Sequence, residues 1–225
     1  MDHDLARPVV LAGALPAAFE SAFLIRCAGA TRLAGQRCRP LVAAAAGPRN
    51  TVAARTGLVE FDREEAAARL AALLTGLGFT AGLEAHDGGG QRRYRVHRVA
   101  VPGPDRPVVN RTMAAAWQQG RATLHATGPV GTSSPRHVQR TALARAAWRA
   151  ASLGCGRVRR RDLIGLRLGD QDLAALLVRA ARVLGVPTTV ERRSGCLVLT
   201  IPPEGAHLLV PGRGRPLAGT AAGRG

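Results

Sequence analysis

The stretch Arg145–Glu191, RAAWRAASLGCGRVRRRDLIGLRLGDQDLAALLVRAARVLGVPTTVE, contains four consecutive elements that decide the fold. Residues 145–154 are mostly small and predict a closely packed helix, and residues 157–168 form an arginine-rich turn and strand. Asp170 is a suitable N-cap for a second helix, because its carboxylate accepts hydrogen bonds from the free N–H groups of the first turn. Apolar residues then recur at the spacing of one helical face, and Gly185 ends this helix before a further strand.

The same order of elements occurs earlier in the chain. The segment Leu77-Gly78-Phe79-Thr80 corresponds to Leu184-Gly185-Val186-Pro187, residues 58–62 head a helix as residues 166–170 do, and residues 19–29 correspond to 145–155. Each half therefore reads helix, strand, strand, helix, strand, strand. A long-range repeat of this kind is a signal about the whole fold, and it predicts an α+β protein built by duplication.

The repeat divides the chain into five segments. They are an N-terminal arm (1–15), a first repeat (16–101), a linker with a possible helix (102–135), a second repeat (136–201) and a tail (202–225). In the first repeat we expect helices over 16–30 and after Asp62, with strands over 41–46, 56–61, 80–86 and 92–101. Trp117 is expected to pack the linker helix, with base stacking as the less favoured alternative. The Gly/Arg/Ala/Pro-rich tail has no pattern of a packed element, and we expect it to be disordered.

The charge balance favours a polyanionic partner. The 225 residues include 32 basic residues, all of them arginine, against 15 acidic ones, which gives a net charge of +17. A charge of this size attracts polyanions, with nucleic acid as the first expectation and an acidic lipid surface or a merely solvated surface as alternatives. The apolar fraction of 46% is sufficient for a core, but only 3% of residues are aromatic, so the core must consist of many small contacts.

Neither a metal site nor a membrane span is expected. The four cysteines are not closely spaced, whereas zinc sites usually draw their ligands from short spacings. Cys27 and Cys155 occupy similar places in the two repeats and are interpreted as small packing residues. The apolar run 9–30 is interrupted by Pro16, Glu20 and Arg26, so we expect a buried helix of a soluble, cytoplasmic protein.

Arginines on three predicted strands are the candidate nucleic-acid contacts. Alternation places Arg93, Arg95 and His97 on one face of strand 92–101, and Arg157, Arg159 and Arg161 on one face of strand 157–168. The complete candidate set is Arg93, Arg95, His97, Arg157, Arg159, Arg160, Arg161, Arg192 and Arg193. Arginine contacts the phosphates of DNA and RNA alike, so the sequence does not separate these two partners. A solvated outer sheet face is the alternative for strand 92–101.

Three segments also carry a family resemblance. Residues 24–29 (LIRCAG), 146–158 (AAWRAASLGCGRV) and 170–186 resemble the two-repeat LAGLIDADG homing endonuclease fold, and more closely its catalytically inactive version in the bacterial regulator WhiA. The resemblance covers about residues 16–201. It implies that the first helices of the two repeats cross at a pseudo-twofold axis, where close approach requires the small residues found at 28–30 and 150–154.

The same resemblance implies that this chain is not an enzyme. The nuclease version ends each motif helix with an acidic residue that holds a divalent cation. The corresponding places here, 28–30 and 154–156, contain no carboxylate. Asp162 and Asp170 come later and are better explained as an arginine partner and a helix cap. We therefore expect no catalytic residue, no metal and no cofactor.

The expected function is that of a non-catalytic DNA-binding protein and WhiA-like transcriptional regulator. The resemblance implies a nucleoid-associated role of the cell-division and sporulation type. WhiA proteins carry a C-terminal helix-turn-helix, and none is evident after Ile201. This leaves non-specific DNA binding, or binding together with a regulatory protein partner, as the expectation. The alternatives are a metal-dependent endonuclease, a scaffold domain that has lost nucleic-acid binding, and a generic α+β domain.

Overall fold

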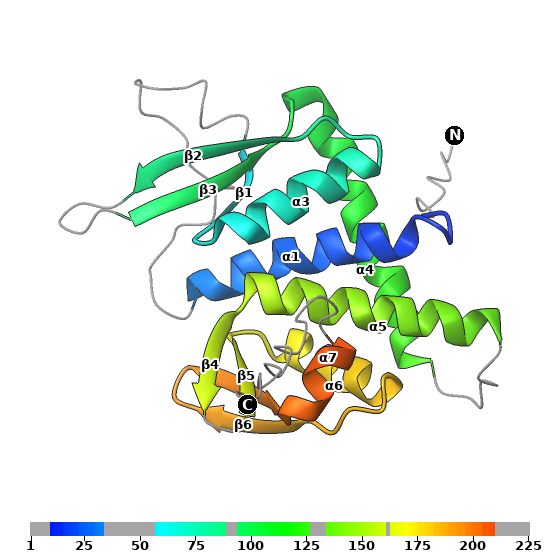
Figure 1. Cartoon of the computed structure of the whole chain (residues 1–225). Helices are drawn as coiled ribbons and strands as arrows, with labels where there is room; N and C mark the ends of the chain where they lie inside the picture. Colours follow the sequence, from blue (N-terminus) through cyan, green and yellow to red (C-terminus); the bar gives the residue numbers. More distant parts are fainter. Residues whose placement is uncertain (1–9, 34–56, 89–93, 127–133, 161–162, 210–225) are drawn as a thin grey trace, which may run out of the picture.

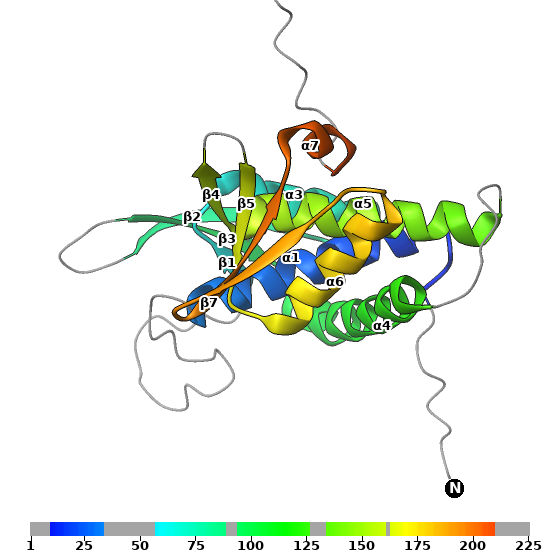
Figure 2. The same ribbon diagram turned by 90° about the horizontal axis from the view of Figure 1, so that it is seen from below.

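The computed structural model describes residues 10–33, 57–88, 94–126, 134–160 and 163–209. Two long helices, α1 (Leu15–Leu33) and α5 (Pro135–Gly154), pack along each other in the centre of the molecule. A sheet lies on either side of this pair, and one helix lies between each sheet and the centre (Figures 1 and 2). The centre of the molecule is therefore made by one helix from each repeat.

The first repeat continues from α1 through β1 (Gly57–Phe61), α3 (Glu64–Gly76), β2 (Gly82–Gly88) and β3 (Tyr94–Ala100). Its strands form an antiparallel sheet in the order β1-β3-β2. The strand expected over 41–46 lies outside the described residues.

The second repeat continues from α5 through β4 (Gly156–Arg160), β5 (Leu163–Leu168), α6 (Gln171–Val183), β6 (Thr189–Arg193) and β7 (Cys196–Ile201). Its antiparallel sheet has the order β4-β5-β7-β6. Within the described residues the two repeats share the order helix, strand, helix, strand, strand and the antiparallel pairing of these strands, and the second repeat has one additional strand, β4, before β5. This confirms the α+β fold class and the repetition of one unit in the two halves of the chain.

Two segments are more ordered than the sequence predicted. The expected linker contains a short 3-10 helix, η1 (Gly103–Asp105), followed by α4 (Arg106–His125), which packs on α1. The expected tail begins with a helix, α7 (Pro203–Leu209), whose last residue is fully buried. α4 buries one face, which carries Val109, Met113, Trp117 and Leu124, and α7 is held by contacts with α5 and β5. Residues 210–225 lie outside the described structure.

The starts of the two sheet-covering helices differ. Asp170 caps α6 as predicted, because its Oδ1 accepts hydrogen bonds from the N–H groups of Asp172 at 2.7 Å and Leu173 at 3.2 Å. Asp62, after which this helix was expected, was also the expected N-cap of α3, and that expectation is wrong. The N-cap position is held by Arg63, which makes no side-chain cap, so Asp62 stands one residue too early to reach the first turn.

The ends of the same two helices are alike. Gly78 has φ +86° and Gly185 has φ +71°, a left-handed conformation that favours glycine. The N–H of Phe79 donates to the carbonyl of Leu74 at 3.0 Å, and the N–H of Val186 donates to that of Ala181 at 2.9 Å. The repeated Leu-Gly dipeptide therefore ends both helices in the same way, as the sequence predicted.

Small residues bring the central helices together. A Cβ added to Gly154 of α5 would lie 2.8 Å from Cβ of Cys27 on α1, so only glycine fits at this crossing. A Cβ on Gly120 of α4 would lie 2.2 Å from the ring of Phe19. Trp117 is buried and its ring stacks on Phe19 with centroids 5.9 Å apart, which confirms its predicted packing role. No helix among the described residues is long and apolar enough to cross a membrane.

Candidate nucleic-acid interface

Each sheet has one face that belongs to the core and one that we call its outer face. The core face of the first sheet carries Val59, Phe61 and Val99, which join the same apolar cluster as the leucines of α3. The core face of the second sheet carries Leu166 and Leu199, which join that cluster with the leucines of α6. Because helices already cover the core faces, a nucleic acid that lies across a sheet must contact the outer face.

The structure places Arg95 and His97 on the core side of the first sheet. His97 pairs with Phe61 across the ladder and is only 8% exposed, and Arg95 lies on the same face nearer the start of β3. The predicted alternation along this strand is correct, but the face assigned to binding is the one that faces α3. Arg93 lies outside the described residues.

The outer face of the first sheet has its arginine occupied by a carboxylate. Arg98 donates from Nε and Nη2 to Oε1 of Glu60 at 3.0 and 2.6 Å. Nε2 of His86 lies 3.8 Å from the same oxygen, and the exposed Glu84 pairs with Arg98 across the ladder. This face therefore carries acidic side chains beside its arginine and offers little net positive charge.

The outer face of the second sheet is more basic. Arg167 on β5 is exposed and pairs with Gly156 and Val198, which places it on the face opposite Leu166. Arg193 on β6 lies on the same face and forms an ion pair with Glu191 at 2.9 Å. Arg167 was not among the predicted contacts, although it alternates with Leu166 and Leu168 in the sequence, and this alternation is a sufficient signal.

The remaining predicted arginines do not form one surface. Arg192 lies on the core side of β6, next to α6, and so points away from Arg193. Arg159 and Arg160 pair with Ile164 and Leu163 in the backbone ladder, but their side chains lie outside the described structure. Arg161 also falls outside the described residues.

Two arginines meet at the C-terminal end of α5. Arg157 pairs with Leu166 on the core side, and its Nε and Nη2 donate to the carbonyl of Ser152 at 2.9 and 2.7 Å. Arg63 reaches the same place from the first repeat, where its Nη1 donates to the carbonyls of Ser152 at 3.2 Å and Leu153 at 2.9 Å. We call these two side chains the helix-end arginines. They satisfy carbonyls that the last turn of a helix leaves without partners.

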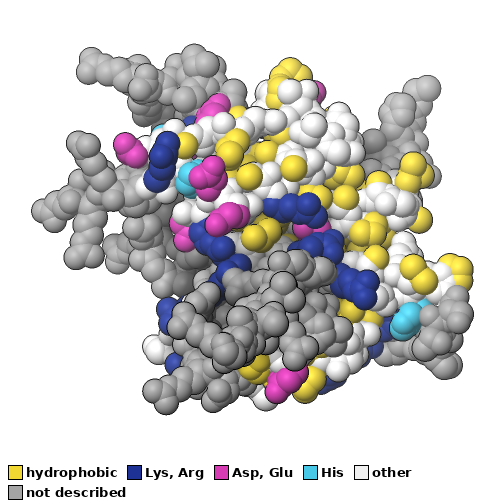
Figure 3. Space-filling view, in the orientation of Figure 1, with side chains coloured by type: hydrophobic (Ala, Val, Ile, Leu, Met, Phe, Trp, Pro, Cys, Tyr) yellow, Lys and Arg dark blue, Asp and Glu magenta, His cyan; other side chains and the backbone are white. Residues whose placement is uncertain are grey.

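A buried carboxylate holds two further arginines between the repeats. Glu20 of α1 is fully buried and accepts from Arg69 of α3 at 2.7 and 3.1 Å, and from Arg149 of α5 at 2.7 and 3.1 Å. The hydrogen bond to Glu20 raises the pKa of the Arg69 guanidinium above its ordinary value. On the side of the molecule that Figure 3 shows, arginine side chains gather in the middle, between the two repeats.

Sequence reasoning did not identify this cluster. Its signal is that Glu20 is the single acidic residue of α1 and lies within a mostly apolar part of that helix. A carboxylate in such a place is stable only with charged or hydrogen-bonding partners. The partners come from two other helices, and their approach depends on the tertiary fold.

The described residues offer no cluster of three or more His, Cys, Asp or Glu side chains that could hold a metal ion. The Asp170 carboxylate already accepts two N–H groups as a helix cap. The crossing of α1 and α5 carries instead the thiols of Cys27 and Cys155, whose Sγ atoms lie 3.2 Å apart. Burial raises the pKa of the Cys27 thiol well above its ordinary value, and the contact with Cys155 adds to this.

No family model and no curated protein matches the sequence. Among solved structures, full-length DUF199/WhiA from Thermatoga maritima is similar at 12% identity and a TM-score of 0.45, over 90% of this chain and 60% of that one. Mesophilic variants of the homing endonuclease I-DmoI are similar at 14% identity and a TM-score of 0.44, over 87% of this chain and 97% of theirs. I-DmoI in complex with DNA and Mn gives 14% identity and a TM-score of 0.41, over 82% and 90%. This chain thus spans 60% of the length of the WhiA structure, and the likeness to all three is one of fold.

Proposed function

We propose that this chain is a non-catalytic DNA-binding protein that contacts the phosphate backbone through arginines of its second repeat. The net charge of +17 supplies the attraction to a polyanion. The outer face of the second sheet offers Arg167 and Arg193 against one acidic side chain, Glu191. On the outer face of the first sheet Arg98 is bound to Glu60, so we expect the first repeat to contribute less to DNA binding than the second.

The helix-end arginines support the non-catalytic part of this proposal. The nuclease resemblance requires metal-binding carboxylates where the motif helices end. At the end of α5 the side chains present are instead the guanidinium groups of Arg63 and Arg157, bound to main-chain carbonyls. Fixed cations disfavour a divalent metal and attract phosphate. The two guanidinium groups at this position support binding of phosphate over metal-dependent cleavage.

The finer role is that of a WhiA-like transcriptional regulator at the nucleoid, of the cell-division and sporulation type. The sequence resemblance in the two motif helices supports it. Because phosphate contacts carry little sequence information, binding by these arginines is expected to be non-specific. Specific recognition then requires a regulatory protein partner or a further DNA-reading module.

The test is binding of a labelled random-sequence duplex over a salt series, with and without magnesium. We expect log affinity to fall linearly with log salt while the duplex stays intact. The double variant Arg167→Ala/Arg193→Ala should bind more weakly on every sequence, and its salt slope should be lower by about 2. The matched control is Arg182→Ala/Arg192→Ala, which removes the same charge from the α6 side of the second sheet.

Four results would overturn parts of this proposal. Equal losses in the two double variants would mean that only net charge matters and that the outer face is not the interface. Cleavage of the duplex with magnesium would establish the nuclease. No affinity at low salt would favour a scaffold domain, and tighter binding to duplex RNA than to DNA would change the partner.

A further inference from the structure

Strand β6 is an exposed edge of the second sheet. In the strand order of the described residues it pairs with β7 on one side only, and every one of its five residues is exposed. Such an edge presents unpaired main-chain N–H and C=O groups, and another extended chain can pair with them. Within β6, Val190 is a large apolar side chain that is 47% exposed.

The hairpin geometry identifies which residues offer these groups. Arg193 and Cys196 are ladder partners on either side of the two-residue turn Ser194-Gly195, so they form the hydrogen-bonded pair that closes the hairpin. By alternation, Glu191 and Thr189 also direct their N–H and C=O groups toward β7. The main-chain groups of Val190 and Arg192 therefore point to the open edge.

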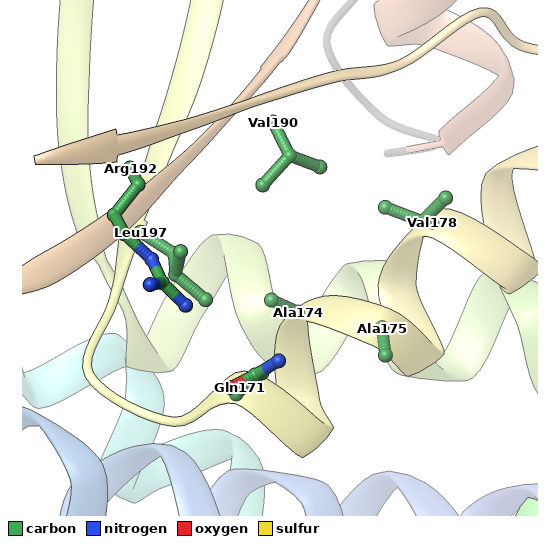
Figure 4. A pocket seen from close by; sticks show the side chains of 7 residues that line it. All are labelled: Gln171, Ala174, Ala175, Val178, Val190, Arg192 and Leu197. Atoms are coloured by element: carbon green, nitrogen blue, oxygen red, sulfur yellow. The ribbon is translucent and has the colours of Figure 1, made fainter.

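A groove runs along the core side of this edge, between β6 and α6. Its volume is about 320 Å³, and Figure 4 shows the side chains that line it. Ala174, Ala175 and Val178 contribute from α6, and Val190 and Leu197 contribute from the sheet. The same two residues of β6, Val190 and Arg192, thus offer their main-chain groups to the edge and their side chains to the groove.

The groove is polar at one end. Arg192 and Gln171 lie there, while Val190 and Val178 lie at the other end (Figure 4). Within the described part of the chain, neither the Arg192 guanidinium nor the Gln171 amide has a hydrogen-bond or ion-pair partner. A carboxylate would satisfy the guanidinium, and the net charge of +17 favours an acidic occupant over a basic one.

We propose that β6 and α6 bind an extended, acidic peptide segment of a partner protein by strand addition. The added strand pairs with the main-chain groups of Val190 and Arg192. It places one apolar side chain in the groove beside Val190 and one carboxylate opposite Arg192. Side chains on one face of a strand are two residues apart, so the two anchors are separated by one residue. Because the added strand runs antiparallel to β6, the acidic residue opposite Arg192 precedes the apolar residue opposite Val190 in the peptide sequence.

The experiment uses the full chain and a capped, fluorescein-labelled peptide of threonines with one glutamate two residues before one leucine. A second peptide has the same composition but places glutamate and leucine three residues apart, on opposite faces. Anisotropy titration measures both affinities at the same salt. We expect the second peptide to bind about tenfold more weakly, because only one of its anchors can face the groove. Methylation of the main-chain nitrogen that faces β6 should weaken the first peptide similarly.

Charge reversal tests the anchor. Arg192→Glu should weaken the first peptide by about tenfold, and a peptide with lysine in place of glutamate should recover most of that affinity. Arg193→Glu is the matched control, since it makes the same charge change on the opposite face of β6. It should leave the difference between the two peptides unchanged.

Four outcomes would overturn the proposal. They are equal affinity for the two peptides, equal losses in Arg192→Glu and Arg193→Glu, indifference to main-chain methylation, and a concentration-dependent dimer that Arg192→Glu dissociates. The last would assign the edge to a second copy of this chain. None of these measurements involves DNA, so they stand apart from the test of DNA binding.

Discussion

The two repeats have the same backbone plan and different outer faces. Both end their sheet-covering helix with a left-handed glycine, Gly78 or Gly185, and both supply one central helix. On the outer face of the first sheet, however, Arg98 is bound to Glu60. The second sheet exposes Arg167 on the corresponding face. The core and helix ends keep the two halves alike, whereas the open sheet faces are free to diverge in charge.

This difference indicates that the fold and the binding surface depend on separate sets of residues. A substitution in the buried contacts between the repeats should change the stability of the protein. A substitution on an outer face should change its affinity for a polyanion. Variants that change one property and leave the other would support this separation, and variants that change both together would contradict it.

The largest effect is expected at the buried ion-pair cluster between the repeats, in which Glu20 binds Arg69 and Arg149. Glu20→Gln removes the buried charge that Arg69 and Arg149 share, and the amide NH₂ then faces two donor groups. Both guanidinium groups are partly exposed and regain some hydration, so we expect the free energy of unfolding to fall by about 2–3 kcal/mol. Urea denaturation measures this loss. Glu84→Gln, on the exposed outer face, should change stability by less than about 0.5 kcal/mol.

A similar loss in the two glutamate variants would contradict the idea that Glu20 joins the repeats. DNA affinity separates the roles further. Glu20→Gln should bind a random duplex as the parent does, provided that binding is measured at a temperature where the variant remains folded.

The second-largest effect is expected from two variants that reverse a charge, one on the outer face of each sheet. Glu84→Arg makes the first sheet more basic, and we expect it to raise duplex affinity severalfold and the salt slope by about 1. Arg167→Glu should lower affinity by about tenfold for the opposite reason. Both changes are read from anisotropy over a salt series.

If neither variant changed the salt dependence of duplex affinity, the outer faces of the sheets would not be part of the DNA interface. An increase from Glu84→Arg with no decrease from Arg167→Glu would reverse the comparison, because it would assign the interface to the first repeat.

The sequence was sufficient for the local features and insufficient for the choice of sheet face. Asp170 and the two Leu-Gly helix ends act within a few residues, so their roles follow from neighbouring positions. Strand 94–100 alternates arginine and histidine with valine on both faces, and neither set is clearly apolar. Which face is buried depends on Phe61 and on α3, far away in sequence.

The helix-end arginines show the same limit. Arg63 looks like an ordinary charged residue before a helix, and its role arises only because the end of α5 lies beside it. Arg157 was predicted as a nucleic-acid contact, and the structure places its guanidinium on a main-chain carbonyl. A dense run of arginine therefore indicates cationic character more reliably than it indicates which side chains face a ligand.

A smaller effect tests the likeness of the repeats directly. Gly78→Ala and Gly185→Ala should each destabilise the protein by about 1 kcal/mol, because alanine is strained at positive φ and the added Cβ meets nothing within 4 Å. Gly76→Ala is the control, since its Cβ also meets nothing and its φ is not positive. It should be neutral or slightly stabilising. Unequal costs at Gly78 and Gly185 would show that the two helix ends differ energetically.

The smallest effect appears only in alkali, at the crossing to which each repeat contributes a thiol. Burial and the neighbouring Cys155 raise the pKa of Cys27 in the folded protein, so above about pH 8.5 the unfolded chain loses this proton first. The unfolded state then binds fewer protons, and the free energy of unfolding falls as pH rises, by at most about 1.4 kcal/mol per pH unit.

Urea denaturation between about pH 7.5 and 9.5 measures this change below the pH range in which tyrosine titrates. Cys27→Ala should flatten this slope. The matched control is Cys196→Ala, which removes a half-buried thiol at the start of β7, away from the crossing. A slope that survives Cys27→Ala would place the titrating group elsewhere, and the crossing would then hold the repeats together by packing alone.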